Sequence, residues 1–442
     1  MVYLLKINKF EKKKKLLFFL VLDPIIKTQI MKKLMFTVQV ILLFIFYSCS
    51  KDESQIPTPN VIVKTPTSVN VVKTNPIKVL MHYMPWFETN DSNNGTWGLH
   101  WTMALSNPNY IDNVTGKRQI ASFYYPLIGP YHSGDPAVIE YHLLLMKYSG
   151  VDAAVIDWYG THNIYDYKIN FDNSDQFIKR TKEVGIDFGI VYEPYITTNV
   201  ENVTGQNKSL AAIDDLKFLK NNYFNQTNYL KINDETAFLA FGNNFTGNEW
   251  NSIFSSSEVT PRMYFLQYLT NSSSLTSINP SPGEFFWVNS SDNIGQTNWD
   301  INYKGAKISG AYPGFKDYYI QGGWTNNHLN WEINLGVDTL KDRLNLTKNL
   351  NANVVQIQTF NDFGEGTMME PTVEFGFSFL SELQKFTGVP YSTKELELIY
   401  KYYLLRTKYK STVTDSQTKE IFNYLITLKV DDAESLINKY YK

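Results

Sequence analysis

From residue 77 onward the chain alternates short apolar runs with longer amphipathic stretches, and this alternation limits the folds open to it. The apolar runs are nearly continuous, which is typical of parallel strands covered on both faces. Eight runs predict strands: Ile77–Tyr83, Val151–Asp157, Ile186–Glu193, Ala237–Phe241, Met263–Tyr268, Glu284–Val288, Ala306–Ala311 and Asn353–Phe360. Helical patterns between several of them cover Pro136–Ser149, Ser174–Val184, Ala211–Asn222 and Gly336–Asn349. This order predicts an α/β fold, a (β/α)8 TIM barrel over residues 76–388.

The chain beyond residue 375 is helical in pattern, with Leu and aromatic residues at helical spacing. The predicted helices are Phe377–Phe386, Thr393–Thr407, Asp415–Leu428 and Asp431–Tyr441. We expect the first to be the last barrel helix and residues 389–442 to form a short helical appendage. Because this segment has no cluster of acids or histidines, we expect no catalytic role for it.

The single cysteine, Cys49, ends an apolar run over residues 34–47 that follows the pair Lys32-Lys33. One cysteine permits no intrachain disulfide and no Cys-rich zinc site. The run is short for a bilayer span but fits the apolar region of a secretory signal. We therefore expect residues 31–49 to be a lipoprotein signal peptide with Cys49 as the lipidated residue. It resembles the relaxed signals of Bacteroidetes lipoproteins.

The residues on either side of this signal also bear on the predicted cellular location. Ser50-Lys51-Asp52-Glu53 resembles the export signal for the outer cell surface, so we expect an exported outer-membrane lipoprotein that is exposed at the cell surface. Residues 50–75 have linker composition, and residues 1–30 read as a spurious or non-structural extension. A Sec-cleaved soluble protein and a short N-terminal anchor remain as alternatives.

Net charge argues against one class of partner. Residues 49–442 carry 32 Lys and Arg against 41 Asp and Glu, a net charge of −9. Phosphate backbones need clustered basic residues, so nucleic acid is not an expected partner. Membrane contact is expected only through the lipid anchor, and the protein is expected to be a monomer.

Carboxylates and aromatic residues gather where the predicted strands end, which is where barrel enzymes place their working residues. The candidate substrate-binding residues from these ends are Tyr83, Trp86, Asp157, Trp158, Tyr159, Glu193, Tyr195, Tyr312 and Trp324. Two carboxylates among aromatic platforms suit cleavage of a glycosidic bond, because one acid protonates the leaving oxygen while the other assists at the sugar.

Each of these candidates also has a structural interpretation. Asp157 could cap a helix or hold the barrel rim, and Glu193 could hold its loop. The tryptophans are as readily core residues as sugar platforms. The histidines fit structural or hydroxyl-binding roles better than metal ligation, and no His pair is spaced for a metal site, so neither a metal nor another cofactor is expected. These histidines are His82, His100, His132 and His328.

The segment after the eighth strand carries the strongest signal: Asn361-Asp362-Phe363-Gly364-Glu365-Gly366. Asp362 and Glu365 lie three residues apart in a Gly-rich turn, and Glu370 follows closely as a further candidate substrate-binding residue. Close carboxylates raise each other's pKa values, which keeps one of them protonated near neutral pH. Asp362 and Glu365 are therefore the predicted catalytic pair, with helix-terminal acids as the structural alternative.

This segment, continued through Thr367-Met368-Met369-Glu370-Pro371, resembles the signature of glycoside hydrolase families 71 and 99. Four shorter motifs share the resemblance: His82-Tyr83-Met84-Pro85-Trp86, Phe123-Tyr124-Tyr125-Pro126, Ile156-Asp157-Trp158-Tyr159 and Tyr192-Glu193-Pro194-Tyr195. The resemblance to these families covers about residues 77–385. It implies a metal-independent α-glycosidase, usually endo-acting, on a (β/α)8 barrel.

The resemblance also implies roles for the pair. In the mannan-cleaving family 99, two glutamates lie three apart; the first draws a proton from the sugar's 2-hydroxyl to form an anhydro-sugar, and the second is the acid/base. Carried over, Glu365 matches the acid/base and Asp362 the first position. Asp in place of Glu looks more like the α-1,3-glucanase family 71, whereas Gly366-Thr367 and Glu370-Pro371 resemble the mannan branch.

Together these features predict an endo-acting glycoside hydrolase on an extracellular α-linked polysaccharide or oligosaccharide, either α-mannan or α-1,3-glucan. The alternative from another class is a surface glycan-binding lipoprotein that kept the fold and lost catalysis. Metal-dependent hydrolysis is disfavoured. Retaining or inverting stereochemistry is left open by the sequence.

Overall fold

The computed structural model describes residues 66–259, 263–267 and 283–441. The expected extension, the signal peptide and Cys49 lie outside these ranges, as does most of the expected linker. No helix in the described ranges is both long and apolar enough to cross a membrane.

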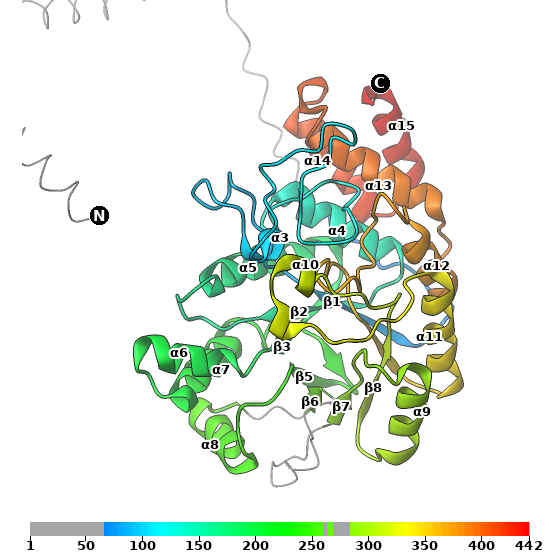
Figure 1. Cartoon of the computed structure of the whole chain (residues 1–442). Coiled ribbons are helices and arrows are strands. Elements are labelled where there is room, and N and C mark those ends of the chain that lie inside the picture. The colour runs from blue at the N-terminus through cyan, green and yellow to red at the C-terminus, as the bar shows by residue number, and fades with distance from the viewer. Residues whose placement is uncertain (1–65, 260–262, 268–282, 442) are drawn as a thin grey trace, which may run out of the picture. The chain divides into compact units, whose positions relative to one another are not determined.

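Eight parallel strands form a curled sheet with helices around it, so the predicted α/β class is confirmed (Figure 1). They are β1 (Lys78–Tyr83), β2 (Ala153–Trp158), β3 (Asp187–Tyr192), β5 (Glu235–Ala240), β6 (Met263–Gln267), β7 (Gly283–Phe285), β8 (Lys307–Ala311) and β9 (Val354–Ile357). Their order is β3-β2-β1-β9-β8-β7-β6-β5. The first and last strands of this order, β3 and β5, also pair with each other through Val191–Leu239 and Tyr192–Ala240. Each of the eight predicted strands corresponds to one of these, with ends that differ by a few residues.

A short strand that the sequence pattern did not reveal is β4 (Lys231–Ile232), which pairs antiparallel with β5. It is a two-residue hairpin arm, too short to produce a recognisable apolar run.

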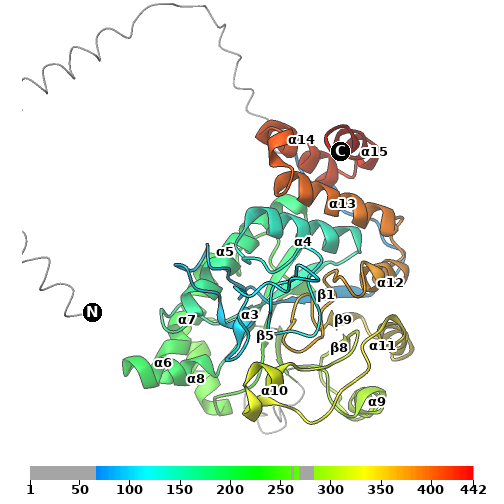
Figure 2. The same ribbon diagram turned by 45° about the horizontal axis from the view of Figure 1, so that its top comes forward.

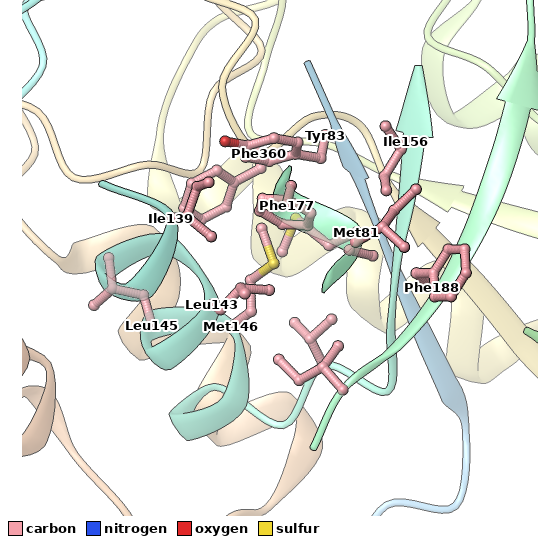
Figure 3. Packing of buried hydrophobic residues seen from close by; sticks show 14 of the residues in the cluster. Met81, Tyr83, Ile139, Leu143, Leu145, Met146, Ile156, Phe177, Phe188 and Phe360 are labelled. Atoms are coloured by element: carbon pink, nitrogen blue, oxygen red, sulfur yellow. The ribbon is translucent and has the colours of Figure 1, made fainter. Parts of the chain in front are cut away.

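The sheet is buried on both faces, as the continuous apolar runs predicted. All six residues of β2 are buried. On the outer face, Leu143 and Met146 of α4 (Pro136–Tyr148) point toward Met81 and Phe177 (Figure 3). The start of α4 is fixed by its sequence, because the Asp135 side chain accepts from the Ala137 N–H at 2.7 Å and Pro136 follows it.

The remaining helices between the strands are α3 (Leu99–Thr102), α5 (Tyr167–Val184), α6 (Ile196–Thr204), α7 (Lys208–Asn222), α8 (Gly247–Ser257), α9 (Asp292–Asn302), α10 (Tyr319–Gly322) and α11 (Val337–Asn349). Helix α5 begins seven residues before its predicted start at Ser174. Asn is a poor helix former, but Asn173 is buried and donates to Pro85 O at 2.9 Å and to Glu88 Oε1 at 2.7 Å. Tertiary hydrogen bonds therefore extend this helix beyond what local propensity predicts.

The C-terminal helices pack on one another in sequence, and the second of them packs against α4 (Figure 2). They are α12 (Ser378–Thr387), α13 (Thr393–Arg406), α14 (Asp415–Ile426) and α15 (Val430–Tyr440). Glu140 of α4, 2% exposed, accepts from the Tyr402 hydroxyl at 2.6 Å and forms an ion pair with Arg406. A buried charge must be paired to be tolerated, so α13 supplies the groups that α4 requires.

Residues 66–75, the described end of the expected linker, have no helix or strand but are bound to the domain. Val69 N donates to Ile426 O at 3.0 Å, and Asn75 N donates to Thr387 O at 3.0 Å. The buried Lys147 amine donates to Val69 O at 2.6 Å. These contacts lie at the amino-terminal edge of the parallel strands.

Candidate active site

A cavity of about 250 Å³ opens where the carboxyl ends of the strands meet. Four carboxyl groups line it: Asp157 from the end of β2, Glu193 just after β3, and Asp362 and Glu365 from the turn after β9. Its other lining side chains are mainly aromatic or apolar: His82, Met84, Trp86, Phe87, His100, Met103, Tyr159, Phe241, Trp287, Tyr319 and Trp324. The fold therefore brings together carboxylates that lie more than 200 residues apart in the chain.

The turn that carries Asp362 and Glu365 is held by hydrogen bonds from its first residues. Thr359 Oγ1 accepts from Asp362 N at 2.8 Å and contacts Thr367 Oγ1 at 3.0 Å. The Asn361 side chain accepts from Met84 N at 2.8 Å and donates to Met84 O at 2.9 Å, which joins the turn to the end of β1. Both catalytic candidates are thus held on a fixed backbone.

Glycine is required at the end of this turn. Gly366 has φ 66°, and a Cβ there would lie 2.8 Å from Lys316 O. This close approach lets Lys316 N donate to Glu365 O at 2.9 Å, while Tyr318 N donates to Gly364 O at 2.8 Å. The loop after β8 is therefore fastened to the turn.

The pKa values of the two carboxyl groups are raised to different extents. Burial and the nearby charge of Asp362 raise the pKa of Glu365 to about 8. Burial raises the pKa of Asp362 to about 6, opposed by the Glu365 N–H, which donates to Asp362 Oδ1 at 3.0 Å. Between these values Glu365 retains its proton while Asp362 is ionised, which is the pairing that acid–base chemistry requires.

Asp157 and Glu193 form a second carboxyl pair, joined by a side-chain hydrogen bond. Burial and the charge of Glu193 raise the pKa of Asp157 well above its usual value, and burial raises that of Glu193 to about 7. Because both pKa values are raised, this pair can retain a proton and can both donate to and accept from sugar hydroxyl groups.

The predicted residues Trp86, Asp157, Tyr159, Glu193, Trp324, Asp362 and Glu365 all line this cavity. Tyr195 does not line it. It is 58% exposed on the loop after β3, and its ring lies against Gly242.

Four predicted substrate-binding residues are buried away from the cavity, and for these residues the structure corrects the prediction. Tyr83 stacks on Phe177 at 4.0 Å. Trp158 stacks on Phe218 at 6.1 Å. Both follow a strand residue that faces the cavity, and because successive side chains point to opposite faces, theirs point outward to the helices.

Tyr312 and Glu370 are held by polar partners that do not line the cavity. The Tyr312 hydroxyl donates to Asp292 Oδ1 at 2.9 Å and accepts from Arg343 at 3.0 Å. Glu370 Oε2 accepts from the Tyr131 hydroxyl at 2.7 Å, and its Oε1 lies 3.4 Å from His142 Nε2. Neither side chain is available to substrate.

The structure adds Tyr319 to the site, a residue that sequence reasoning missed. Its hydroxyl donates to Glu365 Oε1 at 2.8 Å. Its position in the loop after the seventh predicted strand, which also carries the predicted residue Trp324, is the sequence signal for it. His82 also lines the cavity, and its Nδ1 lies 2.7 Å from Gln356 Nε2. In the described ranges, no group of three His, Cys, Asp or Glu residues is arranged to hold a metal ion.

Part of this site lies within a segment that is similar to known proteins. Residues 76–257 match the model of glycosyl hydrolase family 99. The chain is a family 99-like protein. The match includes Asp157 and Glu193, whereas Asp362 and Glu365 lie beyond it. Among curated relatives, the glycoprotein endo-α-1,2-mannosidase of Xenopus laevis is 26% identical over 119 residues, 26% of this chain and 25% of the relative.

A second curated relative, the glycoprotein endo-α-1,2-mannosidase-like protein of Danio rerio, is 40% identical over 62 residues, 14% of each chain. The alignments thus span a quarter or less of the length of these relatives. The family 99 endo-α-mannosidase of Bacteroides thetaiotaomicron, solved with bis-tris propane, has TM-score 0.53 and 16% identity; the alignment covers 73% of this chain and 98% of that one. Another structure of the enzyme has TM-score 0.52 and 17% identity with the same coverage. At these identities the likeness concerns the fold.

Proposed function

We propose that this protein is an endo-acting glycoside hydrolase that cleaves α-mannosidic linkages in an extracellular glycan, on a (β/α)8 barrel. One observation carries the proposal: Asp362 and Glu365 lie in one aromatic-lined cavity with pKa values of about 6 and 8. A pair whose environments separate their pKa values supplies a base and an acid at the same pH. The curated relatives are named as endo-α-1,2-mannosidases, which favours α-mannan over α-1,3-glucan.

In the first step, the ionised Asp362 takes the proton of the sugar's 2-hydroxyl, and that oxygen attacks C1. The bond between C1 and the leaving oxygen breaks, and Glu365 gives its proton to the leaving oxygen. The product of this step is an anhydro-sugar, with Asp362 protonated and Glu365 ionised.

In the second step, Glu365 takes a proton from water as the water oxygen attacks C1. The bond between C1 and the 2-oxygen breaks, and Asp362 returns its proton to that oxygen. Both carboxyl groups regain their starting states. Two displacements at C1 predict net retention of anomeric configuration.

The aromatic lining supports a sugar substrate. Trp86, Tyr159 and Trp324 come from three different loops around the carboxylates. Aromatic faces pack on the apolar faces of sugar rings, while carboxyl groups accept from hydroxyl groups. An orientation set in this way brings the reacting bond to the catalytic pair.

The test is incubation with a panel of α-mannans, with α-1,3-glucan as the comparison polysaccharide, and chromatography of the products. We expect oligosaccharides from mannan, and 1H NMR during turnover should show products of retained configuration. Glu365→Gln should lower kcat by about 10²–10⁴-fold, because proton donation is lost. The matched control is Glu374→Gln, which alters a carboxylate that pairs with Lys117 outside the cavity lining.

Three results would contradict the proposal. Products from α-1,3-glucan alone would overturn the choice of substrate. Full activity in Glu365→Gln would overturn the assignment of the acid. Tight binding to a glycan without products from any polysaccharide would favour a glycan-binding lipoprotein instead.

We also propose that the protein is exported as a surface lipoprotein anchored through Cys49. The support is the sequence pattern around Cys49, which lies outside the described residues. Labelled fatty acid should be incorporated by the full chain and not by Cys49→Ala. Equal incorporation by both would exclude Cys49 as the lipidated residue.

A further inference from the structure

The cavity has an unbalanced set of charged groups. Among the residues that the structure describes, its lining contains four carboxyl groups and no Lys or Arg side chain. Of these described lining residues, His82 and His100 are the two that can carry a positive charge. Burial lowers the pKa of His82 to about 3, so this ring is neutral at any pH at which the protein would work. Any positive charge among these lining residues must therefore come from His100.

His100 lies beside a carboxylate and against the face of an aromatic ring. It belongs to α3 in the loop after β1, and its Nε2 lies 3.4 Å from Asp166 Oδ2. The ring stacks on Trp86 with centroids 4.0 Å apart and planes 5° apart. The rings of Phe87 and Trp324 meet it edge to face. A charged imidazole gains from both a carboxylate partner and the face of an indole ring.

We propose that His100, held by Asp166 and stacked on Trp86, is a positioning residue whose positive charge keeps Asp362 ionised beside the other carboxyl groups of the cavity. This inference rests on the proposed function, since it concerns the state of the base. Without such a charge, burial would favour protonated Asp362, and a protonated carboxyl group cannot take the proton of a 2-hydroxyl.

The groups around this pair come from several elements. The charged or titratable groups that act on Asp362 and His100 are Asp157 of β2, Asp166 before α5, Tyr319 of α10, and Glu365 in the turn itself. Among the groups that set the pKa of Asp362, His100 is the one positive charge, and it lowers the value. Asp166 acts on Asp362 through His100.

A purely structural His100 is the alternative, because its ring also fills space against Trp86. The two roles differ in one measurable respect: loss of packing changes stability and KM, whereas loss of a charge changes the ionisation of Asp362. His132 provides a matched control. It lies in the same chain segment and its Nε2 is 3.4 Å from Glu88 Oε1, but it does not line the cavity.

The kinetic test is the pH dependence of kcat/KM in His100→Gln. Loss of the positive charge should move the acidic limb, which reports Asp362, to higher pH by roughly half a unit to one unit. Asp166→Asn should move it in the same direction, and in the His100→Gln background Asp166→Asn should cause no further upward shift. His132→Gln should leave the limb in place.

A second measurement does not depend on activity. The carboxyl 13C resonance of Asp362 can be identified by its loss in Asp362→Asn and titrated in protein labelled at aspartate carboxyl carbons. Its midpoint should rise in His100→Gln and not in His132→Gln. An unchanged midpoint in folded His100→Gln overturns this inference even if the enzyme is active. A raised midpoint in a protein that cleaves no glycan supports the inference and refutes the proposed hydrolase.

Discussion

The hydroxyl group of Tyr319 donates a hydrogen bond of 2.8 Å to Oε1 of Glu365. This bond stabilises the ionised carboxylate and lowers the pKa of Glu365, against the stronger effect of burial. It also fixes the rotamer of the proposed acid, since Tyr319 is itself anchored on α10.

Tyr319→Phe should therefore raise the pKa of Glu365 above its value of about 8. Because Glu365 acts as an acid, the alkaline limb of kcat/KM should move to higher pH. We expect kcat at neutral pH to fall about tenfold through loss of positioning. Stopped assays across the pH range would check both effects, and a limb that moves to lower pH would contradict the direction.

The unmodified enzyme should have a bell-shaped pH profile. Activity should rise with pH as Asp362 loses its proton near pH 6, and fall as Glu365 loses its proton near pH 8. Since the groups interact, the limbs report the pair and not isolated residues. A profile that stays flat from pH 5 to pH 9 would be incompatible with this pair.

Glu370→Ala should act on stability and not on substrate binding. The change removes the acceptor of the Tyr131 hydroxyl and the carboxylate beside His142, both buried. Removing one partner of a buried pair costs about 3–5 kcal/mol of unfolding free energy. Urea denaturation would measure this, with the surface variant Glu374→Ala as control. A raised KM with unchanged stability would restore Glu370 as a binding residue.

Trp324→Ala should weaken substrate binding. Trp324 lines the cavity on the loop after β8, and loss of its apolar face should cost on the order of 1–2 kcal/mol, seen as a raised KM. Trp324→Phe should recover part of the loss because a ring remains. Equal KM values for Trp324→Ala and the parent would exclude this side chain from the substrate contact.

Removal of residues 393–442 should destabilise the whole domain. Glu140 would lose both Tyr402 and Arg406 and keep only Arg180, and the face of α4 that α13 covers would be exposed to water. We expect the truncated protein to be insoluble or to unfold well below the melting temperature of the full chain, as scanning fluorimetry would show. A stable, active truncated protein would mean that the C-terminal helices are dispensable.

Strand positions could be predicted from the sequence because continuous apolar runs require burial on both faces. Side-chain direction follows from alternation along a strand, whereas residue type alone favours Tyr83 and Trp158 as substrate contacts. Their neighbours His82 and Asp157 line the cavity. Because side chains alternate along a strand, Tyr83 and Trp158 must point to the opposite face of the sheet. A strand register counted from Asp157 would have given the correct choice.

Other features depend on contacts that no local pattern contains. The early start of α5 follows from the tertiary bonds of Asn173, and Tyr319 reaches Glu365 only because Gly366 lets the β8 loop approach. The separation of the Asp362 and Glu365 pKa values was foreseen in kind. Burial raises both values, while the charge of Asp362 raises the pKa of Glu365 further and the Glu365 N–H opposes the rise at Asp362.

The hydrogen bonds of residues 69–75 have a mechanical consequence. They fasten the incoming chain at the amino-terminal edge of the strands, whereas the cavity opens at the carboxyl edge. Tension applied through the N-terminal segment would therefore reach the domain on the side opposite the opening of the cavity. A bulky, immobile glycan could therefore approach the cavity from the side opposite residues 69–75.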